Sequence, residues 1–227
     1  MVSPSLDIII GPMFAGKTTK LIEMYDSISK EFNCLAVNYA LDNRYGENQI
    51  VSHDGLRLDC VCIDSLEELS DYKKNPELAL KFLQAKYIFI NEAQFFKGLK
   101  GWSLHVMDFM KKNLVMCGLD LDFRREPFGE INTLIPRATN VYKLYGQCNN
   151  CPRQSEYSHR KINSGDQVLI GSTNEYVPLC KKCYCKLNGI NMILEDYIEK
   201  KAQEQNTRLL NQLSQTSEYT HFGYQSI

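Results

Sequence analysis

The sequence predicts an α/β fold in which a mostly parallel sheet carries helices on both faces and a small zinc-binding unit follows. Residues 11–18, GPMFAGKT, match the phosphate-binding pattern G-x-x-x-x-G-K-[ST]. Short apolar runs alternate with helical patterns up to residue 120. Two C-x-x-C pairs then lie at residues 148–151 and 180–183. Together these features predict a P-loop, NTPase-like nucleotide-binding domain with an added zinc ribbon.

The phosphate-binding motif has the strand and the helix that it needs on either side. Residues 6–10, LDIII, are an apolar run typical of a buried strand. After the loop, apolar side chains recur at helical spacing, at Leu21, Met24, Tyr25, Ile28 and Phe32. Gly11 and Gly16 permit backbone conformations that side chains forbid, so that loop N–H groups can face phosphate oxygens. Lys17 is then expected along the β- and γ-phosphates and the Thr18 hydroxyl on Mg²⁺. The alternative, a glycine turn beside a surface lysine, is disfavoured by this context.

The remaining elements follow in alternation along the first two thirds of the chain. Further strands are predicted at residues 34–40, 58–63, 87–90, 114–120 and 141–145. Helices are predicted at residues 66–72, 77–84, 99–112 and 184–200, and a loop at 42–55. Asn75 and Pro76 suit the cap and first position of the second helix. Ligands of such sheets bind at the carboxyl ends of the strands, where the P-loop, Asn91–Glu92 and Leu119–Asp120 all fall.

Bulk composition narrows the class of protein. The chain has 227 residues and a formal net charge of −1, which argues against a nucleic-acid or membrane surface. No apolar run approaches the ~20 residues of a membrane span. The first residues carry no basic, signal-like segment, so we expect a cytoplasmic protein.

Nine cysteines in a reducing compartment indicate metal binding more than disulfides. Cys148, Cys151, Cys180 and Cys183 have the paired spacing of a tetrahedral four-thiolate zinc site. Four protein ligands leave no open position, so the zinc is expected to be structural. A redox pair is the alternative, which does not require two matched C-x-x-C pairs.

We therefore predict four parts of the chain. Residues 1–147 form the P-loop α/β domain, and residues 148–185 form the zinc-binding domain with a long loop pinned at its base. A C-terminal helix follows at 186–200, and the polar residues 201–227 form a poorly ordered tail.

Glu92 is the candidate catalytic residue. A carboxylate near the γ-phosphate can accept the proton of an attacking hydroxyl, although a solvated or ion-paired strand-end glutamate is the alternative. Aromatic residues stand close by in the sequence, at Phe95, Phe96, Phe123 and Phe128, and belong either to the core or to a site that stacks on a planar base. These residues predict phosphoryl transfer from ATP to a small planar substrate that bears a hydroxyl.

These blocks resemble the type II thymidine kinase family, the zinc-containing, cytosolic kind. The resemblance covers residues 5–185 and rests on residues 11–18, 42–45, 92–96 and 119–129 together with the two cysteine pairs. It implies ATP-dependent phosphorylation of thymidine, and of deoxyuridine, to supply DNA precursors by nucleoside salvage. It also implies a homotetramer and dTTP as feedback inhibitor.

The resemblance further implies a role for each matching residue. Glu92 would take the proton from the 5′-hydroxyl of the nucleoside. Contacts to ATP and Mg²⁺ would come from Gly11, Pro12, Met13, Phe14, Ala15, Gly16, Lys17, Thr18, Asp42, Asn43, Arg44, Asn91 and Gln94. The thymine pocket and a lasso-like loop over the nucleoside would use Phe95, Leu119, Phe123, Phe128, Ser158, Gln167, Val168, Leu169, Ile170, Gly171 and Tyr176. The zinc ligands of the family match Cys148, Cys151, Cys180 and Cys183.

One departure concerns magnesium. The family carries Asp before the catalytic Glu, in the magnesium shell, whereas this chain carries Asn91. Loss of that charge predicts weaker Mg²⁺ affinity. The rival function is a nucleotide-dependent switch or binding module whose zinc ribbon contacts a partner. A nucleic-acid ribbon needs clustered Lys and Arg, whereas the segment between the cysteine pairs is nearly neutral.

Overall fold

The structure is a computed structural model that describes residues 3–41, 48–162, 166–167, 174–190 and 200–210. Residues 1–184 and residues 185–227 form two separately compact units. The first unit contains the predicted α/β domain and the two cysteine pairs. The carboxyl ends of its strands are the part that positions the candidate site.

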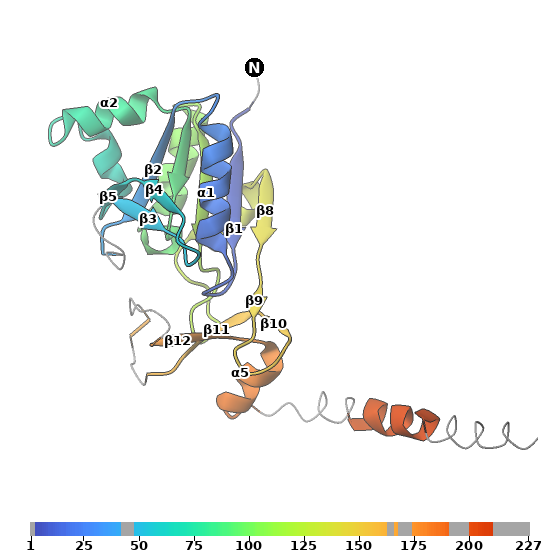
Figure 1. Ribbon diagram of the computed structural model, residues 1–227. Coiled ribbons are helices and arrows are strands. Elements are labelled where there is room, and N and C mark those ends of the chain that lie inside the picture. The colour runs from blue at the N-terminus through green and yellow to red at the C-terminus, as the bar shows by residue number, and fades with distance from the viewer. Residues whose placement is uncertain (1–2, 42–47, 163–165, 168–173, 191–199, 211–227) are drawn as a thin grey trace, which may run out of the picture. The chain divides into compact units, whose positions relative to one another are not determined.

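The central sheet has six strands in the order β5-β2-β6-β7-β1-β8 (Figure 1). All neighbours in it pair in parallel. The strands are β1 (Leu6–Ile10), β2 (Cys34–Tyr39), β5 (Val61–Ile63), β6 (Tyr87–Ile90), β7 (Asn113–Gly118) and β8 (Asn140–Lys143). The predicted parallel α/β class is therefore confirmed. Parallel neighbours require crossover connections, which here run over both faces of the sheet.

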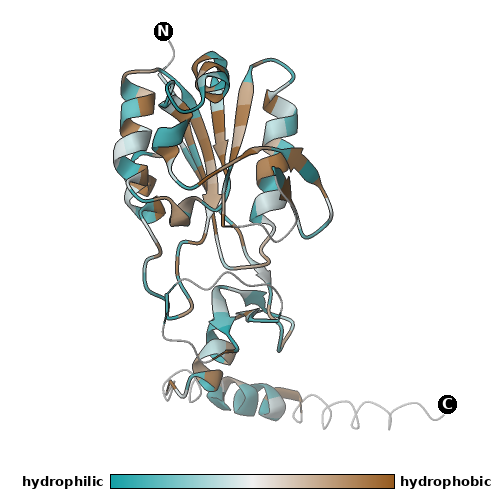
Figure 2. Cartoon of the chain, turned by 90° about the vertical axis from the view of Figure 1, so that its left-hand side faces the viewer, coloured by the Kyte–Doolittle hydropathy of each residue, from teal (hydrophilic) through white to brown (hydrophobic). Residues whose placement is uncertain are grey.

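Alternation along the strands separates two cores. In β1, Ile8 and Ile10 point to one face and Ile9 points to the other. The face of Ile9 is covered by α1 (Lys17–Ile28), through Leu21 and Ile22. The other face is covered by η1 (Leu66–Ser70), α2 (Pro76–Gln84), α3 (Leu99–Asp108) and α4 (Ile131–Leu134). Figure 2 shows the apolar strands enclosed by helices whose outer faces are hydrophilic, as a sheet buried on both faces requires.

The second predicted helix begins as expected. The side chain of Asn75 accepts a hydrogen bond from the Leu78 N–H at 3.0 Å, and Pro76 occupies the first position. At the other end of α2, the buried Lys112 ammonium donates to the carbonyls of Leu83 and Ala85, at 3.0 and 2.6 Å. Burial lowers the pKa of Lys112. This helix is therefore fixed at both termini by side chains.

Two predictions between residues 42 and 63 need correction. Part of the predicted loop at 42–55 is a strand, β3 (Gln49–Val51), which pairs antiparallel with β4 (Arg57–Asp59). The single strand predicted at 58–63 divides into β4 and β5, which belong to different sheets. Three-residue strands are too short to show alternation in a sequence. The resulting β3–β4 hairpin turns at residues 52–55, where Gly55 has a φ of 86°.

The cysteine-bearing segment has its own short pairs of strands. They are β9 (Gly146–Gln147) with β10 (Gln154–Ser155), and β11 (Tyr157–Arg160) with β12 (Tyr176–Leu179), followed by α5 (Lys181–Leu187). Residues 200–210 are helical, whereas the sequence predicts a poorly ordered tail from residue 201. The helix predicted at 186–200 is wrong at residues 188–190, because α5 ends at Leu187 and these three residues are not helical. Residues 191–199 of that helix and residues 211–227 of the tail lie outside the described residues.

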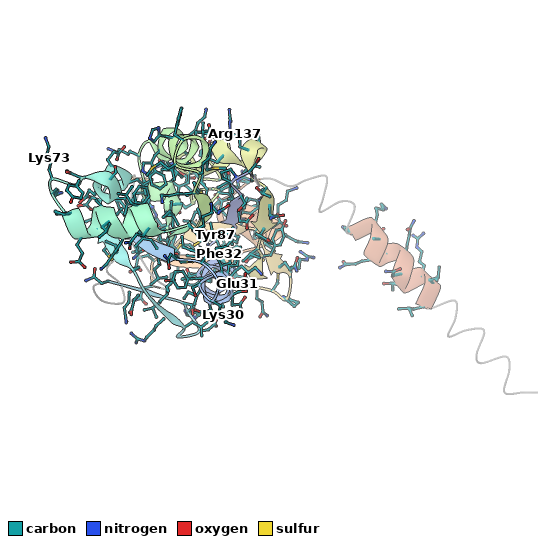
Figure 3. All side chains as sticks on the ribbon, turned by 90° about the horizontal axis from the view of Figure 1, so that it is seen from above. Lys30, Glu31, Phe32, Lys73, Tyr87 and Arg137 are labelled. Atoms are coloured by element: carbon teal, nitrogen blue, oxygen red, sulfur yellow. The ribbon has the colours of Figure 1, made fainter. Side chains whose placement is uncertain are left out.

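Aromatic rings close the amino-terminal edge of the sheet, away from the site. Phe32 and Tyr87, labelled in Figure 3, stand just before β2 and at the start of β6, and their ring centroids are 5.3 Å apart. Within the described ranges, no helix combines the length and apolar character that crossing a bilayer requires.

Candidate active site

A cavity of about 200 Å³ opens at the carboxyl ends of β1, β6 and β7. Its walls come from the P-loop, the β3–β4 hairpin, the strand ends and the cysteine-bearing unit. The lining residues are Met13, Phe14, Gly16, Lys17, Thr18, Thr19, Val51, His53, Asp54, Glu92, Phe95, Cys117, Gly118, Leu119, Leu121, Asp122, Phe123, Phe128, Ser158, Arg160, Gln167 and Tyr176. Of the predicted site residues, Asp42, Asn43, Arg44, Val168, Leu169, Ile170 and Gly171 lie outside the described residues.

The P-loop needs its glycines for different reasons. Gly11 has a φ of 147°, and a Cβ there would lie 2.2 Å from the Leu144 carbonyl oxygen. Gly16 has a φ of 79° and caps α1 without a side-chain hydrogen bond, at the helix end where N–H groups suit a phosphate. The Lys17 ammonium folds back over the loop and donates to the Pro12 carbonyl at 2.7 Å. The loop therefore has a concave, donor-rich surface beside the cavity.

Glu92 follows β6 by two residues and has a left-handed conformation, with φ 53° and ψ 42°. A residue other than glycine in this region stores about 1 kcal/mol of strain or more, and such residues cluster at functional sites. Its carboxylate accepts a hydrogen bond from the Gln94 side-chain amide at 2.6 Å, and the Gln94 carbonyl accepts from the Leu119 N–H at 3.0 Å. Gln94 thus ties the ends of β6 and β7 together and orients the Glu92 carboxylate at the cavity wall.

Asn91 lies behind the P-loop in a buried polar network. Its carbonyl oxygen lies 3.5 Å from the Thr18 hydroxyl and accepts from the Cys117 thiol at 3.0 Å. Its amide nitrogen donates to the Asn38 side chain at 2.9 Å. The oxygen of Asn91 therefore faces the residue predicted to ligate Mg²⁺, and the network is uncharged.

Asp120 does not line the cavity. Its carboxylate pairs with the Lys143 ammonium at 2.8 Å. Burial disfavours the charged form of Lys143, but the hydrogen bond and the attraction of Asp120 outweigh it and raise the pKa of Lys143. Asp120 therefore links the end of β7 to β8, which is a structural role.

Aromatic side chains form one end of the cavity. The Phe95 and Phe128 rings meet edge to face at 5.5 Å, and Phe95 also stacks on Tyr39 at 5.2 Å. Phe123 and Tyr176 complete the wall. Every described residue predicted for the thymine pocket and the lasso is among the lining residues, namely Phe95, Leu119, Phe123, Phe128, Ser158, Gln167 and Tyr176.

A hydrogen bond joins the cysteine-bearing segment, which contains β9 to β12, to the P-loop. The Ser158 hydroxyl in β11 accepts from the Met13 backbone N–H at 2.9 Å. Gly146, at the entry to this unit, is packed so closely that a Cβ there would lie 3.0 Å from the Phe14 carbonyl oxygen. Strand β11 and the entry to the cysteine-bearing segment are therefore in direct contact with the P-loop.

Several lining residues were not among the predicted ones. The tip of the β3–β4 hairpin reaches the P-loop, where His53 meets the Phe14 ring at 5.9 Å and Asp54 accepts from the Thr19 hydroxyl at 2.9 Å. Arg160 is also in the wall, although the sequence presents it only as one charge of a nearly neutral segment. No local motif marks these positions, because their place depends on tertiary contacts.

The four predicted zinc ligands come together. The sulfur atoms of Cys148, Cys151, Cys180 and Cys183 all lie within 4.8 Å of one another. The Sγ distances from Cys151 to Cys180 and to Cys183 are 3.6 and 3.7 Å. Tetrahedral zinc with Zn–S bonds of about 2.3 Å needs sulfurs about 3.8 Å apart. The donor set and its spacing therefore fit a zinc ion.

The four clustered thiols shift one another's pKa values in opposite directions. Burial raises the pKa of Cys148, but backbone hydrogen bonds from Cys180 and Asn150 outweigh it and bring the pKa to about 7. Burial and the three neighbouring cysteines raise the pKa of Cys183 to about 12. A bound cation favours all four thiolates, because it offsets the repulsion among them.

Comparison with known proteins agrees with this geometry. The family profile described as "Thymidine kinase" matches residues 4–184. The "Thymidine kinase" of rabbit fibroma virus (strain Kasza) is 36% identical over 186 residues, which is 81% of this chain and 98% of the viral protein. That of Porphyromonas gingivalis (strain ATCC 33277) is 34% identical over 187 residues, 82% of this chain and 87% of the bacterial protein. That of Oryza sativa subsp. japonica is 34% identical over 181 residues, 79% of this chain and 65% of the plant protein.

Proposed function

Because the chain belongs to the thymidine kinase family, we propose that it transfers the γ-phosphoryl group of ATP to the 5′-hydroxyl of thymidine, giving dTMP and ADP. One observation carries this proposal. A single cavity is lined by the P-loop residues Lys17 and Thr18, by the carboxylate of Glu92 and by an aromatic wall. Phosphorylation of a nucleoside requires groups that bind phosphate, a group that accepts a proton and groups that stack on the nucleobase.

In this proposal the chain acts mainly by positioning and charge neutralisation. The P-loop N–H groups and Lys17 hold the triphosphate at the amino end of α1. Glu92 accepts the proton of the 5′-hydroxyl as the hydroxyl oxygen bonds to the γ-phosphorus, while the bond from that phosphorus to the β,γ-bridging oxygen breaks and ADP leaves. Gln94 keeps the carboxylate aimed at the cavity. Bound Mg²⁺ would neutralise charge on the phosphate oxygens, with the Thr18 hydroxyl as its protein ligand and the Asn91 oxygen behind it.

The aromatic wall would hold the thymine base. Phe95 and Phe128 are fixed against each other edge to face, so the pocket is largely formed before the nucleoside arrives. A hydrophobic pocket separates substrates that differ by one methyl group by only ~1–3 kcal/mol. We therefore expect deoxyuridine to be a second substrate.

An ADP-release assay with and without thymidine tests the proposed transfer. We expect turnover to require thymidine, because the attacking hydroxyl belongs to the nucleoside, and the product to be dTMP. A nucleotide-dependent switch would instead hydrolyse ATP at the same rate in either condition. Thymidine-independent release of ADP would therefore support the switch and contradict the kinase.

Replacement of Asn91 tests the magnesium site. We expect Asn91→Asp to lower the Mg²⁺ concentration needed for half-maximal rate by about 3- to 10-fold, because it places a charge beside Thr18 in the position of the Asn91 oxygen. The measurement is the initial rate as a function of free Mg²⁺ at saturating thymidine and ATP.

Asn38→Asp is the matched control for this prediction. It adds the same charge to the same buried pair, on the side of Asn91 that faces away from Thr18. The control should not shift the magnesium curve to lower concentration. An unchanged curve for Asn91→Asp, or an equal shift in both variants, would contradict a role for position 91 in the magnesium shell.

The family resemblance also supports a homotetramer and inhibition by dTTP. Light scattering after size-exclusion chromatography measures the first, and the effect of dTTP on initial rate measures the second.

A further inference from the structure

Arg160 is a buried cation of the cysteine-bearing segment. It belongs to β11 and is only 5% exposed. Its Nε and Nη2 atoms donate to the Tyr176 hydroxyl at 3.0 and 2.7 Å, and Nη2 also donates to the Gln167 carbonyl at 2.9 Å. A guanidinium is removed from water only at high cost unless such partners satisfy it. These hydrogen bonds hold the Arg160 guanidinium in one orientation.

The same guanidinium lies flat on an aromatic wall of the cavity. Its central carbon is 3.8 Å from the centroid of the Phe123 ring, which is close stacking on one face. The Arg124 guanidinium also lies over this ring, 4.9 Å from its centroid. Phe123, Tyr176 and Arg160 all line the cavity, so one side chain holds two of its walls in fixed orientation.

Further hydrogen bonds connect Arg160 to Asp166 and Gln167. Its Nη1 atom donates to the Asp166 carbonyl. The Gln167 side chain donates in turn to the Asp122 carboxylate at 2.9 Å, next to Phe123 in the chain. Burial raises the pKa of Tyr176, which keeps its phenol neutral despite the opposing effect of Arg160. A neutral hydroxyl still accepts from the guanidinium, so the network persists across the physiological pH range.

We propose that Arg160 is a positioning residue for the nucleoside base, because its guanidinium fixes the ring plane of Phe123 and the hydroxyl of Tyr176 as a preformed slot for a planar pyrimidine. This inference rests on the proposed function and assigns to Arg160 a specific part in it. Lysine cannot replace this group, because an ammonium lacks the plane that stacks and the fork that reaches the hydroxyl and the carbonyls together.

The test compares Arg160→Lys with wild type. We expect the KM for thymidine, and its Kd by calorimetry, to rise about 10- to 100-fold, because stacking and several hydrogen bonds to the slot are lost. The KM for ATP should stay within about 2-fold, since the P-loop is untouched, and kcat should fall much less than the KM rises. Zinc content and circular dichroism show whether the variant is folded.

Arg125→Lys is the matched control. Arg125 also places its guanidinium over two rings of this unit, 5.7 Å from Tyr157 and 5.1 Å from Tyr184, but it does not line the cavity. Arg125→Lys should keep the KM for thymidine within about 2-fold of the wild-type value. An equal rise in both variants, or a parallel rise in the KM for ATP, would show a general loss of structure and overturn the positioning role.

Tyr176→Phe decides the matter if Arg160→Lys does not fold. It removes only the hydroxyl that Arg160 binds, and we expect a rise of about 3- to 10-fold in the Kd for thymidine. An unchanged Kd in this variant, or in folded Arg160→Lys, would overturn the proposal. If wild type binds thymidine without phosphorylating it, the proposed transfer fails and the calorimetric comparison still judges Arg160. If wild type does not bind thymidine, both are wrong.

Discussion

Glu92→Gln should lower kcat for thymidine phosphorylation by about 10²- to 10⁴-fold, the range that a positioned general base contributes. Glutamine keeps the shape of the side chain and its reach into the cavity, but it cannot accept the proton of the 5′-hydroxyl. The Gln94 amide, which donates to the Glu92 carboxylate at 2.6 Å, can still donate to the new carbonyl oxygen. We therefore expect the Kd values for ATP and thymidine to change by no more than about 3-fold.

The measurement is single-turnover formation of dTMP under saturating substrates, which separates chemistry from product release. Glu126→Gln is a suitable control, because it makes the same charge change at an exposed residue of the loop between Phe123 and Phe128. Full activity in Glu92→Gln would mean that the proton leaves by another route and that the proposed mechanism is wrong.

Loss of the predicted zinc site should have the other large effect. Cys151→Ser removes one of four thiolates that lie within 4.8 Å of one another. Structural zinc in small domains contributes about 10–16 kcal/mol of apparent binding free energy, so the unit around it loses its main support when the ion is gone. We expect zinc content to fall from about one ion per chain to near zero and thymidine phosphorylation to fall at least 100-fold.

Binding of ATP separates this loss from global unfolding. The sheet that carries the P-loop has its own two cores. The variant should therefore still bind ATP, and the α/β part should still show a cooperative thermal unfolding transition. Cys34→Ser is the control, because Cys34 stands at the start of β2 outside the thiol cluster, and burial raises its pKa to about 11. Normal zinc content and full activity in Cys151→Ser would contradict a structural zinc site.

The fold was predictable where the sequence carries strong local signals. The apolar run at 6–10, the P-loop and the cap formed by Asn75 each specify an element by local chemistry, and the structure has them at those positions. The β3–β4 hairpin was not predictable, because three-residue strands have no readable period and their pairing depends on contacts far along the chain.

The candidate site divides in the same way. Glu92 stands out because it follows a compact apolar strand, and the four cysteines stand out because of their paired spacing. Arg160 does not, since its importance comes from the Phe123 and Tyr176 rings, which lie 37 and 16 positions away in the sequence. His53 and Asp54 reach the P-loop only through the hairpin turn. Side chains brought to a site by tertiary packing leave no local pattern that a single sequence displays.

The hydrogen bond from Met13 N–H to the Ser158 hydroxyl has a thermodynamic consequence. It joins strand β11 to the P-loop, so a shift of either one changes the energy of the other. Linkage then requires reciprocity: whatever factor a bound nucleoside applies to the affinity for ATP, bound ATP must apply to the affinity for the nucleoside. In equilibrium titrations, the Kd for each substrate is therefore expected to change by the same factor when the other substrate is bound.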